Sequence, residues 1–152
     1  MSTRNYDIQK NFMILTAQVA RQWRRAINRR LQPLGLTEAT WLPLLHLARA
    51  AEPMRQKDLA LSLSLDSSSV VRLLDELQSS GFILRVQNED RRAKTVELTA
   101  LGKMTVEGVE LVVDAARKEI FAGVPAEELT LAFYALEKIS ESLSSSAPDN
   151  AT

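Results

Sequence analysis

The stretch QKDLALSLSLDSSSVVRLLDELQSSGFI, residues 56–83, contains two short helical patterns separated by the residues around Ser64 and Leu65. The second pattern follows Asp66, a residue type that caps helix N-termini, and it stops at Gly81. Its apolar residues fall on one helical face: Val70, Leu73, Leu74 and Leu77. Two helices joined by so short a turn predict a helix-turn-helix.

Two β-strand patterns follow this motif. FILRVQ and TVELT both alternate between apolar and polar residues. The segment between them, Asn88–Lys94, is polar and too long for a two-residue hairpin turn, so we expect a flexible projecting loop. A helix-turn-helix followed by a hairpin has the element order of a winged helix. The predicted fold class is therefore mainly α, with a small β-hairpin as the wing.

Long helices are predicted on both sides of this region. Apolar residues recur at spacings of three and four before Pro33 and Gly35: Ile8, Phe12, Leu15, Val19, Trp23, Ile27 and Leu31. A helix of that length exceeds what so small a core covers, and part of its stripe should meet a second chain. Another helix is expected from Thr37, whose hydroxyl should cap it. Two more are expected over residues 99–122 and 126–143.

The composition narrows the function classes. The 152 residues include no cysteine and one histidine, His46, which excludes disulfides and zinc–thiolate sites and leaves few catalytic pairings. With no glycine-rich phosphate loop or metal-spaced cluster either, the sequence argues against an enzyme. No apolar run is long enough to span a membrane, and the N-terminus lacks a signal-peptide pattern. We therefore expect a soluble, cytoplasmic protein.

The formal net charge of zero hides an asymmetry along the chain. Residues 1–36 carry seven basic residues and one acidic, whereas residues 104–152 carry three basic and nine acidic. Such charges are usually a solvated face, but oppositely charged ends also fit a dimer or a basic binding surface.

Basic residues at the wing suggest a partner, because the major groove of double-stranded DNA admits a helix and its minor groove attracts arginine. The helix after Asp66 would place four residues near bases and phosphates: Ser67, Ser68, Ser69 and Arg72. In the wing, Asp90 would orient Arg92 for the minor groove, with Arg85, Arg91 and Lys94 on phosphates. The serines also suit simple capping, and Arg72 also suits a solvated face.

The wing region carries a family resemblance. DRRAKTVELTALG fits the wing pattern of MarR-family transcriptional regulators at five positions: Asp90, Arg92, Leu98, Thr99 and Gly102. Further similarity runs through RQWRRAINRRLQPLGLTEATW, through the helix-turn-helix and through EIFAGVPAEEL, from about residue 19 to residue 143. The chain resembles this family, close to its SlyA-like branch.

The resemblance implies a homodimer in which each protomer offers one winged helix to a pseudo-palindromic operator, as a repressor or as an activator. It divides the chain into an N-terminal dimerisation helix (1–36), a winged helix-turn-helix (37–103), C-terminal dimerisation helices (104–145) and a disordered tail (146–152), within a single domain overall. We expect no cofactor and no membrane association.

Many relatives respond to small aromatic carboxylic acids, which suggests such an effector here. Arg21 and Trp41 occupy positions where SlyA-like proteins line a pocket, the arginine for a carboxylate and the indole as an apolar wall. Leu45 stands where some relatives have histidine, and His46 should point elsewhere. Without cysteine, the chain cannot use a thiol-oxidation switch.

Two other functions remain open beside a sequence-specific regulator. A weakly specific chromosome-binding protein would share every basic feature, because phosphate contacts do not discriminate between sequences. A winged helix that binds protein is the second alternative, although such versions tend to lose the positive wing.

Overall fold

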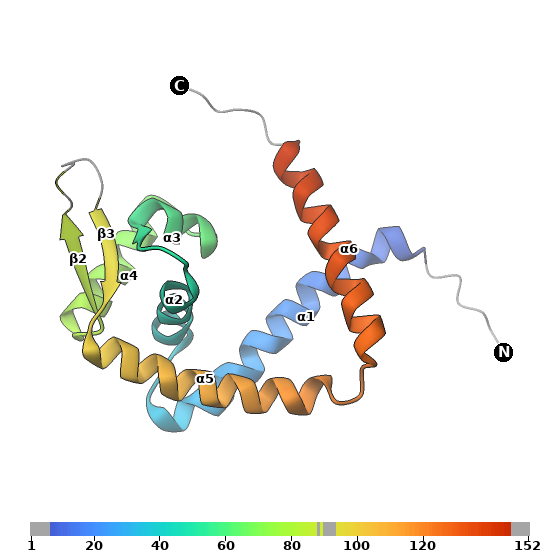
Figure 1. The fold of residues 1–152 in the computed structure, drawn as a ribbon, viewed down its shortest axis with the longest axis horizontal. Helices are drawn as coiled ribbons and strands as arrows, with labels where there is room; N and C mark the ends of the chain where they lie inside the picture. Colours follow the sequence, from blue (N-terminus) through green and yellow to red (C-terminus); the bar gives the residue numbers. More distant parts are fainter. Residues whose placement is uncertain (1–6, 88, 90–93, 147–152) are drawn as a thin grey trace. The chain divides into compact units, whose positions relative to one another are not determined.

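The computed structural model describes residues 7–87, 89 and 94–146 (Figure 1). They fall into two compact units, one within residues 1–116 and one from residue 117 onward. The predicted fold class is confirmed: helices dominate, and a small antiparallel sheet accompanies the helix-turn-helix. Among the described residues, no helix combines the length and apolar character that crossing a bilayer would require.

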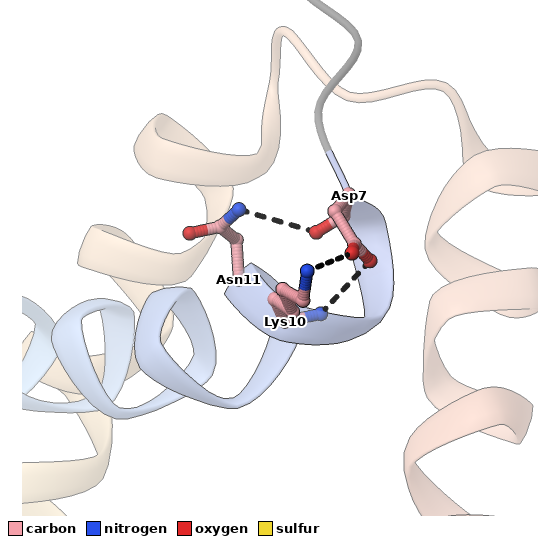
Figure 2. Close-up of polar contacts among 3 residues, drawn as sticks. All are labelled: Asp7, Lys10 and Asn11. Carbon is pink, nitrogen blue, oxygen red and sulfur yellow. Dashed lines mark hydrogen bonds and ion pairs between the residues drawn. The ribbon is translucent and has the colours of Figure 1, made fainter.

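The first helix, α1 (Ile8–Leu31), has the predicted bounds. Asp7 caps it, because its carboxylate accepts a hydrogen bond from the Lys10 backbone N–H at 3.4 Å and pairs with Lys10 Nζ at 2.9 Å (Figure 2). The side-chain amide of Asn11 donates to the Asp7 carbonyl at 3.1 Å. A short 3₁₀ turn, η1 (Gln32–Leu34), and Gly35 at φ 72° then end the helix.

The two halves of α1 differ in burial. Ile27 and Leu31, near its C-terminus, are fully buried, whereas Ile8 is 70% exposed and Ile14 is 64% exposed. The core of the first unit therefore covers one end of the stripe and leaves apolar side chains uncovered at the other.

The second helix, α2 (Glu38–Arg49), begins after Thr37 as predicted, but the predicted hydroxyl cap is wrong. The Thr37 hydroxyl lies 3.4 Å from the Thr40 hydroxyl instead of binding a backbone amide. The Thr37 carbonyl already accepts from the N–H groups of Thr40 and Trp41, both at 2.9 Å. The Thr40 amide, which a capping Thr37 hydroxyl would have bound, therefore already has an acceptor.

The helix-turn-helix consists of α3 (Gln56–Ser62) and α4 (Ser67–Ser79). Val70, Leu74 and Leu77 of α4 are buried, which confirms the predicted apolar face. Gly81 follows the helix at φ 81°, a left-handed conformation that favours glycine.

The sheet has one strand more than predicted. Strands β2 (Ile83–Gln87) and β3 (Lys94–Leu98) pair antiparallel as expected, and β1 (Met54–Arg55) pairs with the other edge of β3, with Met54 opposite Val96. A two-residue strand is too short to show alternation, and its pairing depends on a partner about forty residues away along the chain.

Two apolar cores hold the first unit together, and α2 contributes to both. The core of the winged helix contains Leu44 together with residues of α3, α4 and the sheet. The second core contains Leu45 and Trp41 together with Ile27 of α1 and Val109 of helix α5 (Ala100–Phe121). The segments expected from the sequence, 1–36, 37–103 and 104–145, therefore share their cores.

The LTALG motif docks the start of α5 onto the turn after α4. The Thr99 hydroxyl donates to the Gly81 carbonyl at 2.6 Å and accepts from the Gly102 N–H at 3.0 Å. The Thr99 N–H donates to the Phe82 carbonyl at 3.0 Å. Thr99 therefore caps α5 while binding it to the turn between α4 and β2.

The second unit contains the end of α5 and the last helix, α6 (Ala126–Ser145). No described residue of α6 is buried. The predicted tail, residues 146–152, lies outside the described residues except for Ser146.

Candidate nucleic-acid interface

The N-terminus of α4 is held by one carboxylate. Asp66 Oδ1 accepts from the Ser69 N–H at 2.7 Å and from the Ser68 hydroxyl at 2.8 Å, and Oδ2 accepts from the Ser69 hydroxyl at 3.1 Å. Two of the three predicted serines thus support the cap with their hydroxyls. Ser67 is exposed, and within the described part of the chain its hydroxyl has no partner. The DNA contacts predicted for these serines stay predictions.

These hydrogen bonds stabilise the ionised form of Asp66. The Ser69 backbone N–H contributes most, followed by the Ser68 and Ser69 hydroxyls, and together they lower the pKa of Asp66 below its usual 3.8. Because the folded chain binds this proton less tightly than the unfolded chain, the stabilisation is present above pH 3.8 and is lost as pH falls through the lowered pKa.

We expect Asp66→Asn to remove this acid sensitivity while keeping an oxygen that can cap the helix. In thermal unfolding scans across acid pH, the midpoint of the parent should fall below pH 3.8 more steeply than that of the variant. Asp66→Ala should lower the midpoint at neutral pH as well. Identical pH profiles for the parent and Asp66→Asn would show that the cap does not depend on the charge.

Arg72 lies on the exposed face of α4. Asp75 and Glu76, three and four residues later, are close enough along a helix to pair with it. Within residues 7–87, 89 and 94–146, however, Arg72 makes no ion pair or hydrogen bond. Its guanidinium is therefore available to an outside acceptor.

The wing is described up to both ends of its loop. Lys94 is exposed at the start of β3, opposite Gln87 in the β2–β3 register. Asp90, Arg91 and Arg92 lie outside the described residues, so the predicted Asp90–Arg92 pairing and the contacts of these arginines stay predictions.

Arg85 of β2, predicted to bind phosphate, makes contacts within the chain. It binds Asp75 and Gln78, which both lie on α4. These two partners were not predicted from the sequence, because no local pattern connects a strand residue with helix residues seven and ten positions earlier. Whether Arg85 also reaches a phosphate stays a prediction.

The predicted effector residues lie in different surroundings. Trp41 and Leu45 are 2% and 5% exposed in the second core, and the Trp41 indole N–H donates to Asn28 Oδ1 at 3.4 Å. Arg21 is exposed on α1 and does not belong to that core. The structure thus brings Trp41 and Leu45 together without Arg21.

A groove of about 460 Å³ lies elsewhere in the first unit, between α1, α2 and α4. Its apolar lining includes Leu42, Pro43, Leu63 and Leu73. Its charged lining consists of Arg24, Arg72, Glu38 and Glu76. None of Arg21, Trp41 and Leu45 contributes to this groove, so sequence reasoning did not anticipate it.

His46 connects α2 to α3. Its Nδ1 lies 3.1 Å from the Ser62 hydroxyl oxygen, while that hydroxyl donates to the Leu59 carbonyl at 3.0 Å. Burial lowers the pKa of His46, and the nearby charges of Arg49 and Arg24 lower it further. A neutral imidazole with Nδ1 as the donor satisfies this arrangement, which is a structural role.

The chain is similar to a family model and to several solved structures. A family model described as the MarR family matches residues 36–94. The transcriptional regulator PA3341 is 37% identical, with a TM-score of 0.83, over 88% of this chain and 98% of that chain. The reduced form of MarR from E. coli is 30% identical, with a TM-score of 0.66, over 82% and 93% of the two chains. CouR from Rhodococcus jostii RHA1, crystallised bound to p-coumaroyl-CoA, is 26% identical, with a TM-score of 0.70, over 97% and 99%.

Proposed function

Because this chain belongs to the MarR family of transcriptional regulators, we propose that it is a homodimer that reads a pseudo-palindromic DNA operator through two winged helices. The observation that carries the proposal is Arg72, exposed on α4 and unpaired among the described residues, next to a capped helix start. We place the chain near the SlyA-like branch on its wing motif.

In this proposal α4 is the recognition helix. Its N-terminal half enters the major groove, where Arg72 can donate two hydrogen bonds to guanine and the helix start can donate to phosphate. Arg92 would enter the minor groove, with Asp90 orienting it, and Arg91 and Lys94 would bind phosphates. The assignments at residues 90–92 rest on the sequence motif, because these residues lie outside the described part of the chain.

Uncovered apolar surface supports the homodimer. Leu129, Phe133, Leu136 and Leu143 follow one another along a face of α6, and all four are exposed. A helix with an uncovered apolar stripe needs a partner to be stable in water. The N-terminal half of α1 leaves a similar stripe uncovered, so a second copy of the chain has apolar surface to cover on both helices.

The test is selection of bound duplexes from a random pool, performed with the parent and with Arg72→Ala. We expect the parent to enrich an inverted repeat with half-sites about one helical turn apart. Arg72→Ala should relax the preference at one base pair of each half-site by about 1–3 kcal/mol. Arg92→Ala should weaken binding to all sequences and flatten its salt dependence.

Lys138→Ala, which removes an exposed cation of α6, is the matched control and should leave the enriched motif unchanged. Binding without an enriched motif would favour the weakly specific chromosome-binding protein. No binding to any duplex would favour a winged helix that binds protein.

We further propose that a small aromatic carboxylic acid is the effector. Two places in the first unit are candidates for this ligand. One is the vicinity of Trp41 and Leu45, where the family resemblance adds Arg21, and the other is the groove lined by Arg24 and Arg72. The groove offers apolar side chains and two arginines for a carboxylate. Near Trp41 the arginine would be Arg21, which the family resemblance implies and which lies outside the core that holds Trp41. The aromatic acyl thioester in the CouR crystal supports an aromatic ligand class.

Tryptophan fluorescence should report this ligand, because both indoles lie at the second core. We expect saturable quenching by at least one acid from a broad aromatic panel. Loss of a charged hydrogen bond costs about 1.5–3 kcal/mol. Replacing the arginine that binds the carboxylate with glutamine should therefore weaken the affinity for the acid at least about tenfold. Sensitivity to Arg21→Gln would place the ligand near Trp41, and sensitivity to Arg24→Gln would place it in the groove. A panel without saturable change would contradict the effector.

A further inference from the structure

Arg85 joins the wing to the recognition helix through two short hydrogen bonds. Its Nε donates to Gln78 Oε1 at 2.7 Å, and its Nη2 donates to Asp75 Oδ1 at 2.6 Å, where the two charges form an ion pair. The Arg85 side chain is 25% exposed and that of Asp75 is 56% exposed. The arginine therefore has the more shielded position, while the carboxylate stays near the surface of α4.

The position of Asp75 makes this pairing relevant to DNA. Residues three apart on a helix are neighbours, so the carboxylate of an unpaired Asp75 could draw the Arg72 guanidinium to itself. A free carboxylate on the recognition helix would also repel phosphates. In the described part of the chain, Asp75 pairs with Arg85 and Arg72 remains unpaired.

We propose that Arg85 is a positioning residue that acts as the internal counter-ion of Asp75, keeping Arg72 free to read a base and binding β2 to α4. This inference rests on the proposed function of α4 as a recognition helix. It differs from the sequence expectation that Arg85 binds phosphate, because here the guanidinium acts through Asp75.

The geometry explains why an arginine suits this position. Nε and Nη2 lie on one edge of the planar guanidinium, so a single side chain can bind two acceptors in a fixed orientation. Asp75 and Gln78 are three apart on α4 and present their oxygens on the same side of the helix. A lysine could neutralise Asp75 but offers no comparable planar pair of donors.

The experiment is a double-mutant cycle on operator affinity, using the duplex that the parent enriches. Arg85→Gln should weaken binding about tenfold, the order expected for one charged contact, because it releases Asp75. Adding Asp75→Asn should restore affinity to within about threefold of the parent, because the released charge is then absent. The operator affinity of Arg85→Lys should lie between that of the parent and that of Arg85→Gln.

Glu76→Gln is the matched control, because Glu76 is the other acidic neighbour of Arg72 and has no bond to Arg85. Glu76→Gln should change operator affinity by the same factor in the parent and in the Arg85→Gln background. A second readout is base preference: Arg85→Gln should reduce discrimination at the base pair that Arg72→Ala relaxes, and Asp75→Asn should restore it. Thermal unfolding of each variant confirms that the chain folds.

Three outcomes would overturn the inference. If Asp75→Asn does not rescue Arg85→Gln and the salt slope drops by about 0.9, Arg85 binds a phosphate directly. If Glu76→Gln rescues as well as Asp75→Asn, the effect is general electrostatics. A parent that binds no duplex would remove the proposed function itself, and with it this role, whereas the first two outcomes leave the proposed function intact.

Discussion

Gly102→Ala should destabilise the chain by about 1–3 kcal/mol, the range for overpacking a core, towards its upper end. A Cβ at this position would lie 2.1 Å from the Phe82 carbonyl oxygen and 3.2 Å from its carbon. The oxygen cannot simply move away, because it accepts the hydrogen bond from the Thr99 N–H that docks α5. Relief of the clash therefore has to shift the start of α5 or the turn after α4.

Gly108→Ala is the matched control, because it makes the same change in the same helix. A Cβ at Gly108 would meet nothing within 4 Å, so alanine should stabilise α5 by up to about 1 kcal/mol through its higher helix propensity. Urea unfolding at one protein concentration measures both variants. Equal changes in the free energy of unfolding for Gly102→Ala and Gly108→Ala would show that the close approach between Gly102 and Phe82 is relaxed in solution.

Elements specified by neighbouring residues were predictable from the sequence. The bounds of α1 follow from an apolar stripe that ends at Pro33 and Gly35, and the Asp66 cap depends on residues within three positions. The two longer strands follow from alternation. In each case the physical cause lies within the window that the pattern covers.

Features that depend on packing between distant residues were not predictable. Strand β1 exists because β3 offers an open edge, and the Arg85–Asp75 pair exists because β2 packs beside α4. The predicted Thr37 hydroxyl cap does not form, and the Thr40 amide donates to the Thr37 carbonyl instead. Gly102 matches the family motif, but only the structure shows why glycine is required there: a Cβ would clash with the Phe82 carbonyl.

The same distinction applies to the candidate site. Arg72 was placed on the exposed face of α4 from helical periodicity alone, and the structure agrees. Arg72 lacks a partner among the described residues because Asp75 pairs with Arg85, and that pairing was not predictable from the sequence. The effector residues were carried over from a resemblance, and neither periodicity nor spacing could have separated Arg21 from the core that holds Trp41.

The second large effect concerns the proposed dimer. Phe133→Asp combined with Leu136→Asp should convert the dimer to monomer at micromolar concentration. The two side chains are 59% and 38% exposed in the single chain and lie on the same face of α6. Burying an apolar side chain of this size contributes about 1.5 kcal/mol or more, and a two-fold interface counts each side chain twice. The dimer should therefore weaken by on the order of 6 kcal/mol, or roughly four powers of ten in the dissociation constant.

Leu61→Asp combined with Leu84→Asp tests whether this loss is specific. These side chains are 77% and 53% exposed, so the control adds the same charge to apolar surface of the winged helix. Sedimentation equilibrium should find a dimer for the parent and the control and a monomer for the α6 variant. Because a monomer can occupy one half-site but cannot link two, the α6 variant should also lose its requirement for an inverted repeat. If it stayed dimeric, a different surface would have to join the protomers, and the exposed stripe of α1 would be the next to substitute.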